Sequence, residues 1–160
     1  MVGLLLLGGC GYGPDQARLP GDAHSVAIGL IQNRTNAGEL DVRLHSMLRQ
    51  RLLRHPNIIV TSPDKSNLLL ETRLNELRIV RQRDVSSATV TSLSYTLLGD
   101  FSLRDQRDGN LWWNRQPVTA VGSLNFNTPT LETPAVQDEA LNDTLERFAE
   151  ALERHILTAF

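Results

Sequence analysis

The sequence predicts an α+β fold, a two-layer sandwich in which two amphipathic helices pack on a mostly antiparallel four-stranded sheet. Apolar and polar side chains alternate strictly along Leu93–Leu103, as in a strand with one buried face. Asp108-Gly109 is a typical hairpin dipeptide and indicates an antiparallel return strand. Leu40–Arg54 and the segment that begins at Pro134 carry apolar residues at three- and four-residue spacing, which predicts two helices with one buried face each.

The first half of the chain alternates strand and helix. Ser25–Ile31 is a short, almost continuous apolar run, which predicts a strand buried on both faces. Turn residues at Asn33–Gly38 lead into the helix Leu40–Arg54. Pro56 ends that helix, because a proline disfavours helical backbone in the residue before it. The β-branched segment Asn57–Thr61 is then a short strand, followed by a polar loop.

The second half is predicted to hold the antiparallel strands and the terminal helix. Leu68–Arg83 is a long strand whose apolar positions change parity after Leu74, and such a change indicates a β-bulge. Asn125–Glu132 is expected to be a loop. Thr133-Pro134 then caps and starts the last helix, because the missing N–H of a proline costs nothing in the first turn.

Two adjacent tryptophans lie in the return strand Asn110–Val121. Successive side chains of a strand point to opposite faces, so Trp112 and Trp113 are expected to face opposite ways. One of them then belongs to the core, and the other is exposed, covered by a partner, or covered by loops or a helix of the chain itself. An exposed tryptophan would be a good interface anchor.

The N-terminus looks like a bacterial lipobox. The apolar run Leu4–Leu7 is followed by Gly8, Gly9 and then Cys10, the one cysteine of the chain. Signal peptides end in an apolar segment and small residues, although this one lacks a basic start and is short, which points to a truncated signal. Acylation of Cys10 would anchor the chain, because two or more acyl chains give stable membrane binding. The alternative is an incidental free thiol.

This interpretation divides the chain into three parts. Residues 1–9 are a lipoprotein signal peptide, whose short apolar run and missing basic start indicate truncation. Residues 10–21 are the lipidated cysteine and a flexible leash, because this stretch is rich in Gly and Pro and has no pattern able to bury a face. Residues 22–160 are a single domain, long enough to bury its own core.

Composition and motifs favour a protein without catalysis. The net charge of −2 argues against a general nucleic-acid binder. The four histidines have no metal-ligand spacing with another His, Cys or carboxylate, so the sequence predicts no metal site. It contains no glycine-rich phosphate loop and no serine in a nucleophile elbow, and it predicts neither a cofactor nor an enzyme.

Three arginines mark one end of the long strand. Arg78, Arg81 and Arg83 lie close to the hairpin tip Asp84–Ala88, where their guanidinium groups could bind phosphates bidentately. The alternative is a charged strand end that blocks edge-to-edge pairing.

Several short motifs follow one another in order and together cover the predicted mature chain: Cys10-Gly11-Tyr12, Leu19-Pro20, Ser25-Val26-Ala27-Ile28, Asn33-Arg34-Thr35, Gly38-Glu39-Leu40, Ser66–Leu70 and Gly109-Asn110-Leu111-Trp112. Each motif is weakly specific alone. As an ordered set they resemble the lipopolysaccharide-assembly lipoprotein LptE family.

The resemblance implies a non-enzymatic lipoprotein on the periplasmic side of the outer membrane. Gly11 after Cys10 favours that membrane, because an Asp there retains many lipoproteins at the inner one. LptE proteins plug the lumen of the β-barrel LptD, assemble lipopolysaccharide into the outer leaflet and are thought to bind it. The family also implies two helices against a four-stranded sheet.

Basic residues contact the lipid in the family, which makes Arg78, Arg81 and Arg83 the candidate lipopolysaccharide-binding residues here. The loop Asn125–Thr133 has no basic residue, and in this the chain departs from the family. Two alternatives stay open: an accessory lipoprotein of an ABC-type lipid transporter in the periplasm, and a structural lipoprotein without a transport partner.

Overall fold

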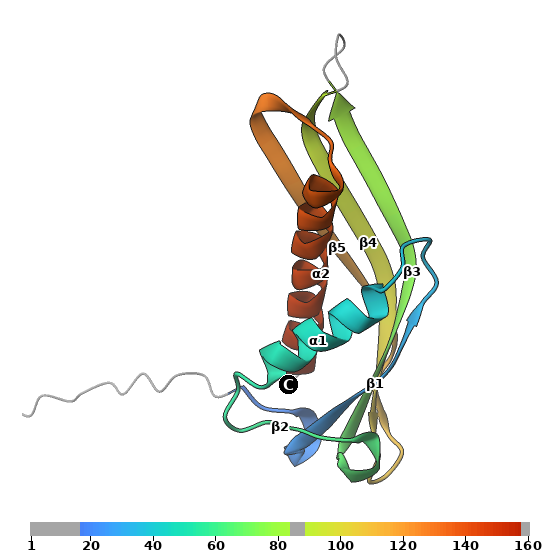
Figure 1. Cartoon of the computed structure of the whole chain (residues 1–160). Helices are drawn as coiled ribbons and strands as arrows, with labels where there is room; N and C mark the ends of the chain where they lie inside the picture. The colour runs from blue at the N-terminus through green and yellow to red at the C-terminus, as the bar shows by residue number, and fades with distance from the viewer. Residues whose placement is uncertain (1–16, 84–88, 158–160) are drawn as a thin grey trace, which may run out of the picture.

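A computed structural model describes residues 17–83 and 89–157 of the chain. Figure 1 shows a long, twisted sheet with both helices on one of its faces. In chain order the elements are the 3-10 turn η1 (Pro20–Asp22), β1 (Ser25–Asn33), α1 (Leu40–Leu52), β2 (Ile59–Val60), the 3-10 turn η2 (Pro63–Lys65), β3 (Leu68–Arg83), β4 (Thr89–Asp105), β5 (Leu111–Leu131) and α2 (Pro134–Leu157). Neither helix, over the range described, is long and apolar enough to cross a membrane.

The sheet has five strands in the order β2-β1-β3-β4-β5, so the predicted class of two helices on a mostly antiparallel sheet is confirmed and the strand number four is wrong. β1 runs parallel to both of its neighbours, whereas β3, β4 and β5 form an antiparallel meander. The additional strand of the sheet is β2, which lies within the predicted short strand Asn57–Thr61. The backbone N–H groups of Ile59 and Thr61 donate to the carbonyl oxygens of His24 and Val26 and so attach it beside β1. A two-residue strand has too little sequence of its own to settle whether it joins a sheet.

β5 is longer than expected. The segment predicted as the loop Asn125–Glu132 continues the strand to Leu131, and there Thr130 pairs with Val90 and Leu131 with Thr89. Its polar composition resembles a loop, but backbone pairing with the extended β4 depends on the partner strand and not on local side chains. A register shift between Val90 and Ser92 accommodates the change.

The predicted β-bulge in β3 is confirmed. The register with β4 shifts between Leu74 and Glu76, so Asn75 is the extra residue. Leu74 is fully buried before the bulge, and Leu77 packs against the same core after it. The bulge therefore keeps the apolar side chains of a long strand on the helix-covered face.

Both helices bury one leucine- or phenylalanine-rich stripe against that face. The fully buried stripe residues are Leu40, Leu44, Leu48 and Leu52 of α1, and Leu145, Phe148, Leu152 and Ile156 of α2. Gly99 of β4 lets α2 approach closely, because a Cβ placed on it would lie 2.8 Å from Cζ of Phe148. The two helices are also joined by Glu153, which accepts hydrogen bonds from Arg51 Nε (2.6 Å) and His55 Nε2 (2.7 Å).

Neither tryptophan is left exposed, and cover from the chain itself is the alternative that holds, because a Cβ placed on Gly21 of η1 would lie 2.8 Å from Cζ2 of Trp112. Trp112 and Trp113 are both half-buried, and both pack against the core. The register shifts on either side of Leu103, which pairs with Trp113, whereas Arg104 pairs with Leu111. The strand therefore bulges at Trp112, and a bulge interrupts the alternation on which the prediction rested.

Candidate functional site

The structure separates the three predicted arginines into two places. Arg78 lies on the open face of the sheet, where its Nε is 2.7 Å from Oε1 of Glu76. This pairing raises the pKa of Arg78 through the hydrogen bond to Glu76. Arg81 and Arg83 lie on the other face of β3 and converge on Glu132. The end of β3 that carries them is the upper end in Figure 1. The sites of Arg78 and of the other two arginines are therefore distinct.

Glu132 holds the two arginines together across the gap between β3 and the start of α2. Arg81 Nε donates a 2.6 Å hydrogen bond to Oε1 of Glu132, and Arg83 Nη2 lies 3.7 Å from its Oε2. Gln137 of α2 also donates to Glu132 Oε1, at 2.8 Å. The Glu132 side chain is 11% exposed, and the hydrogen bond from Arg81 lowers its pKa. One carboxylate thus faces two guanidinium groups, which leaves one positive charge in excess.

An open groove of about 330 Å³ lies beside this cluster, between the sheet, α2 and the loop that leads from β1 to α1. Its apolar lining comes mainly from β3, β4 and α2, and its polar groups come from α2 and from the loop before α1. The lining residues are Asn36, Ala37, Leu77, Ile79, Tyr95, Pro134, Gln137, Asp138 and Leu141. Burial raises the pKa of the Tyr95 phenol, so this hydroxyl stays neutral and can donate a hydrogen bond at physiological pH.

The groove and the Arg81–Arg83–Glu132 cluster together have the chemistry of a site for an anionic amphiphile. Apolar walls suit a hydrocarbon chain, and guanidinium groups bind phosphate or carboxylate bidentately. Arg83 is the more available of the two arginines, because its side chain is 63% exposed and its distance to Glu132 is long. The sequence indicated these arginines, whereas Glu132 and Tyr95 were missed because they come from elements far away in the chain.

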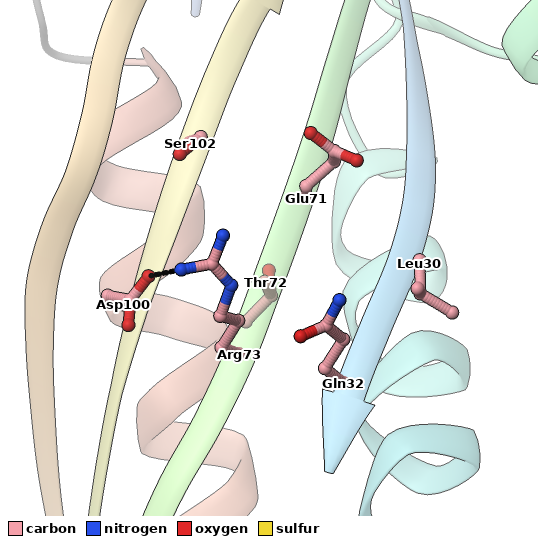
Figure 2. A pocket seen from close by; sticks show the side chains of 7 residues that line it. All are labelled: Leu30, Gln32, Glu71, Thr72, Arg73, Asp100 and Ser102. Carbon is pink, nitrogen blue, oxygen red and sulfur yellow. Dashed lines mark ion pairs between the residues drawn. The ribbon is translucent and has the colours of Figure 1, made fainter. Parts of the chain in front are cut away.

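A second polar cluster lies on the open face of the sheet. Asp100 accepts a 2.9 Å hydrogen bond from Asn75, and its Oδ1 lies 3.6 Å from Arg73 Nη1 and 3.9 Å from Arg115 Nε. Figure 2 shows Arg73 reaching from β3 to Asp100 on β4 above a shallow hollow. The hollow measures about 40 Å³, enough for water and too small for an organic ligand. We therefore assign Asp100 to cross-strand pairing.

A third cluster ties the start of the described chain to the β4–β5 turn. Arg107 donates to both carboxylate oxygens of Asp105, and its Nη2 also donates to the carbonyl of Gly21 at 2.7 Å. Asp105 is only 3% exposed, and the hydrogen bond from Arg107 lowers its pKa to about 2. The β4–β5 turn, which carries this cluster, lies at the lower end of the sheet in Figure 1, whereas β3 ends at the top. The role of the cluster is to hold the η1 turn.

Cys10, the predicted lipidation site, lies outside the described residues. Over residues 17–83 and 89–157, no three His, Cys, Asp or Glu side chains form a group able to hold a metal ion.

Comparison with known proteins identifies the family. The family model for lipopolysaccharide assembly, LptE, matches residues 23–159. The chain belongs to the LptE family. This membership makes it a lipopolysaccharide-assembly lipoprotein of the Gram-negative cell envelope, in a family of non-enzymatic lipoproteins. A search of curated proteins finds no match.

Solved structures show the same fold at low sequence identity. Lipoprotein B from Nitrosomonas europaea is 16% identical, with a TM-score of 0.54, covering 98% of this chain and 92% of that one. A hypothetical protein from Chlamydia trachomatis is 10% identical, with a TM-score of 0.52, covering 84% of this chain and 93% of that one. A protein from Xanthomonas campestris is 11% identical, with a TM-score of 0.53 and coverages of 86% and 85%.

Proposed function

We propose that this LptE-family protein is anchored through Cys10 to the periplasmic side of the outer membrane, where it plugs and assists the LptD β-barrel. In this role it contacts lipopolysaccharide during its assembly into the outer leaflet. Family membership over almost the whole domain supports the assembly role. The lipobox-like sequence Leu7-Gly8-Gly9-Cys10 supports the anchor.

The observation that carries the lipid contact is the position of Arg81 and Arg83 at the end of an apolar groove. Lipopolysaccharide combines phosphates with acyl chains, and this site pairs guanidinium groups with apolar walls. Arg78 is already paired with Glu76 on the opposite face of the sheet and lies away from the groove. Of the three predicted residues, Arg81 and Arg83 are therefore the ones we place in the site.

The first test is isolation of the tagged, detergent-extracted protein, with mass spectrometry of its partners and of the N-terminal peptide. A large outer-membrane barrel together with an acylated Cys10 would support both parts of the proposal. Permeases of an ABC transporter in place of the barrel would move the protein to the alternative function. An unmodified Cys10 would overturn the anchor.

The lipid contact is tested with the double variant Arg81→Glu and Arg83→Glu. Each arginine is exposed or half-exposed, so the variant should stay folded while lipopolysaccharide binding falls by about tenfold or more. Arg78→Glu is the control for a charge reversal on the same strand, compared with each single variant Arg81→Glu and Arg83→Glu, and should bind normally. Equal loss in the control, or no loss in the double variant, would remove the groove from the site.

A further inference from the structure

The outer edge of β1 carries no neighbouring strand over most of its length, within the described part of the chain. β2 pairs only with Ser25 and Val26, whereas β1 continues to Asn33. In Figure 1, β1 extends well past β2 and ends beside the first turn of α1. An edge of this kind presents backbone N–H and C=O groups that another extended segment can pair with.

This edge has a register shift between Ile28 and Ile31, but it lacks two other devices that usually protect an edge strand, charged residues and proline. The segment Ile28–Asn33 contains no charged residue and no proline. β5, at the other edge, carries Arg115 and Pro117 and bulges twice beside Leu103. Charges, prolines and bulges are the ordinary means of preventing strand addition. The contrast indicates that the β1 edge is left open for pairing.

An apolar groove runs between this edge and α1. It measures about 290 Å³ and is lined by Gly29, Leu30, Ile31, Asp41, Val42 and His45. The side chain of Leu30 is 64% exposed, because the ladder with β3 shifts register between Ile28 and Ile31. Val42 on α1 is 67% exposed. Strand and helix thus present two large apolar side chains to solvent, one on each side of the groove.

The groove also carries a negative charge without a partner. Asp41 lines it and is half-buried, and no ion pair or hydrogen bond engages its carboxylate among the residues the structure describes. Arg43, two residues on, is directed instead to Asp138 and Asn142 of α2. A carboxylate beside apolar walls is complementary to a Lys or Arg next to an apolar side chain.

We propose that the β1 edge and this groove bind an extended segment of the partner barrel protein as an added β-strand. One apolar side chain of that segment packs between Leu30 and Val42, and a basic side chain pairs with Asp41. In strand addition, main-chain hydrogen bonds supply affinity and pockets for side chains supply specificity. The open β1 edge provides the first, and the adjacent apolar groove provides the second. The inference rests on the proposed function, because it names the surface that meets the barrel.

The test uses the lipidated full chain in complex with the barrel. A photo-reactive amino acid replaces Leu30 or Val42 in turn, and replaces Leu53 or Val121 as controls of similar exposure. Leu30 and Val42 should cross-link to the same extended barrel segment, and the controls should not cross-link to that segment. Amide exchange in residues 28–33 should slow by about tenfold or more in the complex, since a new strand protects the edge amides.

Charge variants test the side-chain contacts. Val42→Lys and Asp41→Lys should each weaken barrel association by about tenfold. Leu53→Lys, the same kind of change at the other end of α1, should leave it unchanged. If Asp41→Lys destabilises the free chain and leaves barrel association intact, Asp41 serves the positive end of the helix dipole and the predicted basic contact is wrong.

The outcomes separate this inference from the proposed function. A barrel that co-purifies but cross-links only through Leu53 or Val121, with no protection of residues 28–33, overturns the inference and leaves the function standing. Failure of any barrel to co-purify overturns both. Cross-linking of Leu30 to a second copy of this chain, with a dimer in sedimentation, also overturns the inference, because the edge then serves self-association.

Discussion

Gly99 should be one of the least substitutable positions in the sheet. A Cβ on Gly99 would lie 2.8 Å from Cζ and 3.3 Å from Cε2 of Phe148, and it would also meet the backbone carbonyl of Arg73. Contacts below 3.0 Å force a shift, and here one of the two neighbours is backbone of the adjacent strand. Gly99→Ala should therefore lower the free energy of unfolding by about 1–3 kcal/mol, the usual range for overpacking in a filled core.

Urea denaturation followed by circular dichroism measures this change. Gly38→Ala is the matched control, because nothing lies within 4 Å of its added Cβ, and it should be neutral or slightly stabilising. Phe148→Leu in the Gly99→Ala background should recover part of the loss, since the shorter side chain frees the space. A Gly99→Ala protein within about 0.5 kcal/mol of the original would refute the close approach of α2 to β4.

Three further substitutions test the packing and the charge clusters. Asp105→Asn should lower the free energy of unfolding by about 1–2 kcal/mol at pH 7 and very little at pH 2. The pKa of Asp105 is lowered to about 2 in the folded chain, so the ionised carboxylate stabilises the fold above the ordinary pKa of an aspartate, and this stabilisation is lost as the pH falls through 2. Urea titrations at both pH values measure the difference. Burial opposes ionisation of Glu153, yet hydrogen bonds from His55 and Arg51 outweigh it and lower its pKa. Glu153→Gln should therefore cost about 1 kcal/mol at pH 7 and less in acid below the ordinary pKa of a glutamate, and an equal loss at all pH values would contradict an ionic contribution. Leu48→Ala should cost about 2–5 kcal/mol in thermal or urea unfolding, because its fully buried side chain would leave a cavity, and a loss below 1 kcal/mol would place α1 outside the core.

Much of the fold could be predicted because its signals are local. The leucine spacing of α1, the alternation along β4 and the parity change around Asn75 depend only on which face of an element is buried. The separation of Arg78 from Arg81 was also contained in the sequence, because strand residues three apart point to opposite faces unless a bulge intervenes. Nearness in the chain alone places the three arginines in one cluster, whereas their alternation along the strand places Arg78 on the face opposite Arg81 and Arg83.

The remaining features depend on partners that are distant in the chain. The β-branched residues around Ile59 and Val60 indicate a strand, but they do not indicate which strand it pairs with. That pairing with β1, and the pairing of the polar end of β5 with β4, come from backbone groups that every residue carries. The bulge at Trp112 cancelled the alternation used for the tryptophans. Glu132 joined Arg81 and Arg83, and Asp41 faced Leu30 across a groove, only once the sheet and helices had packed. The sequence alone therefore determined which faces are buried, while tertiary packing decided which polar groups meet and which edge stays open.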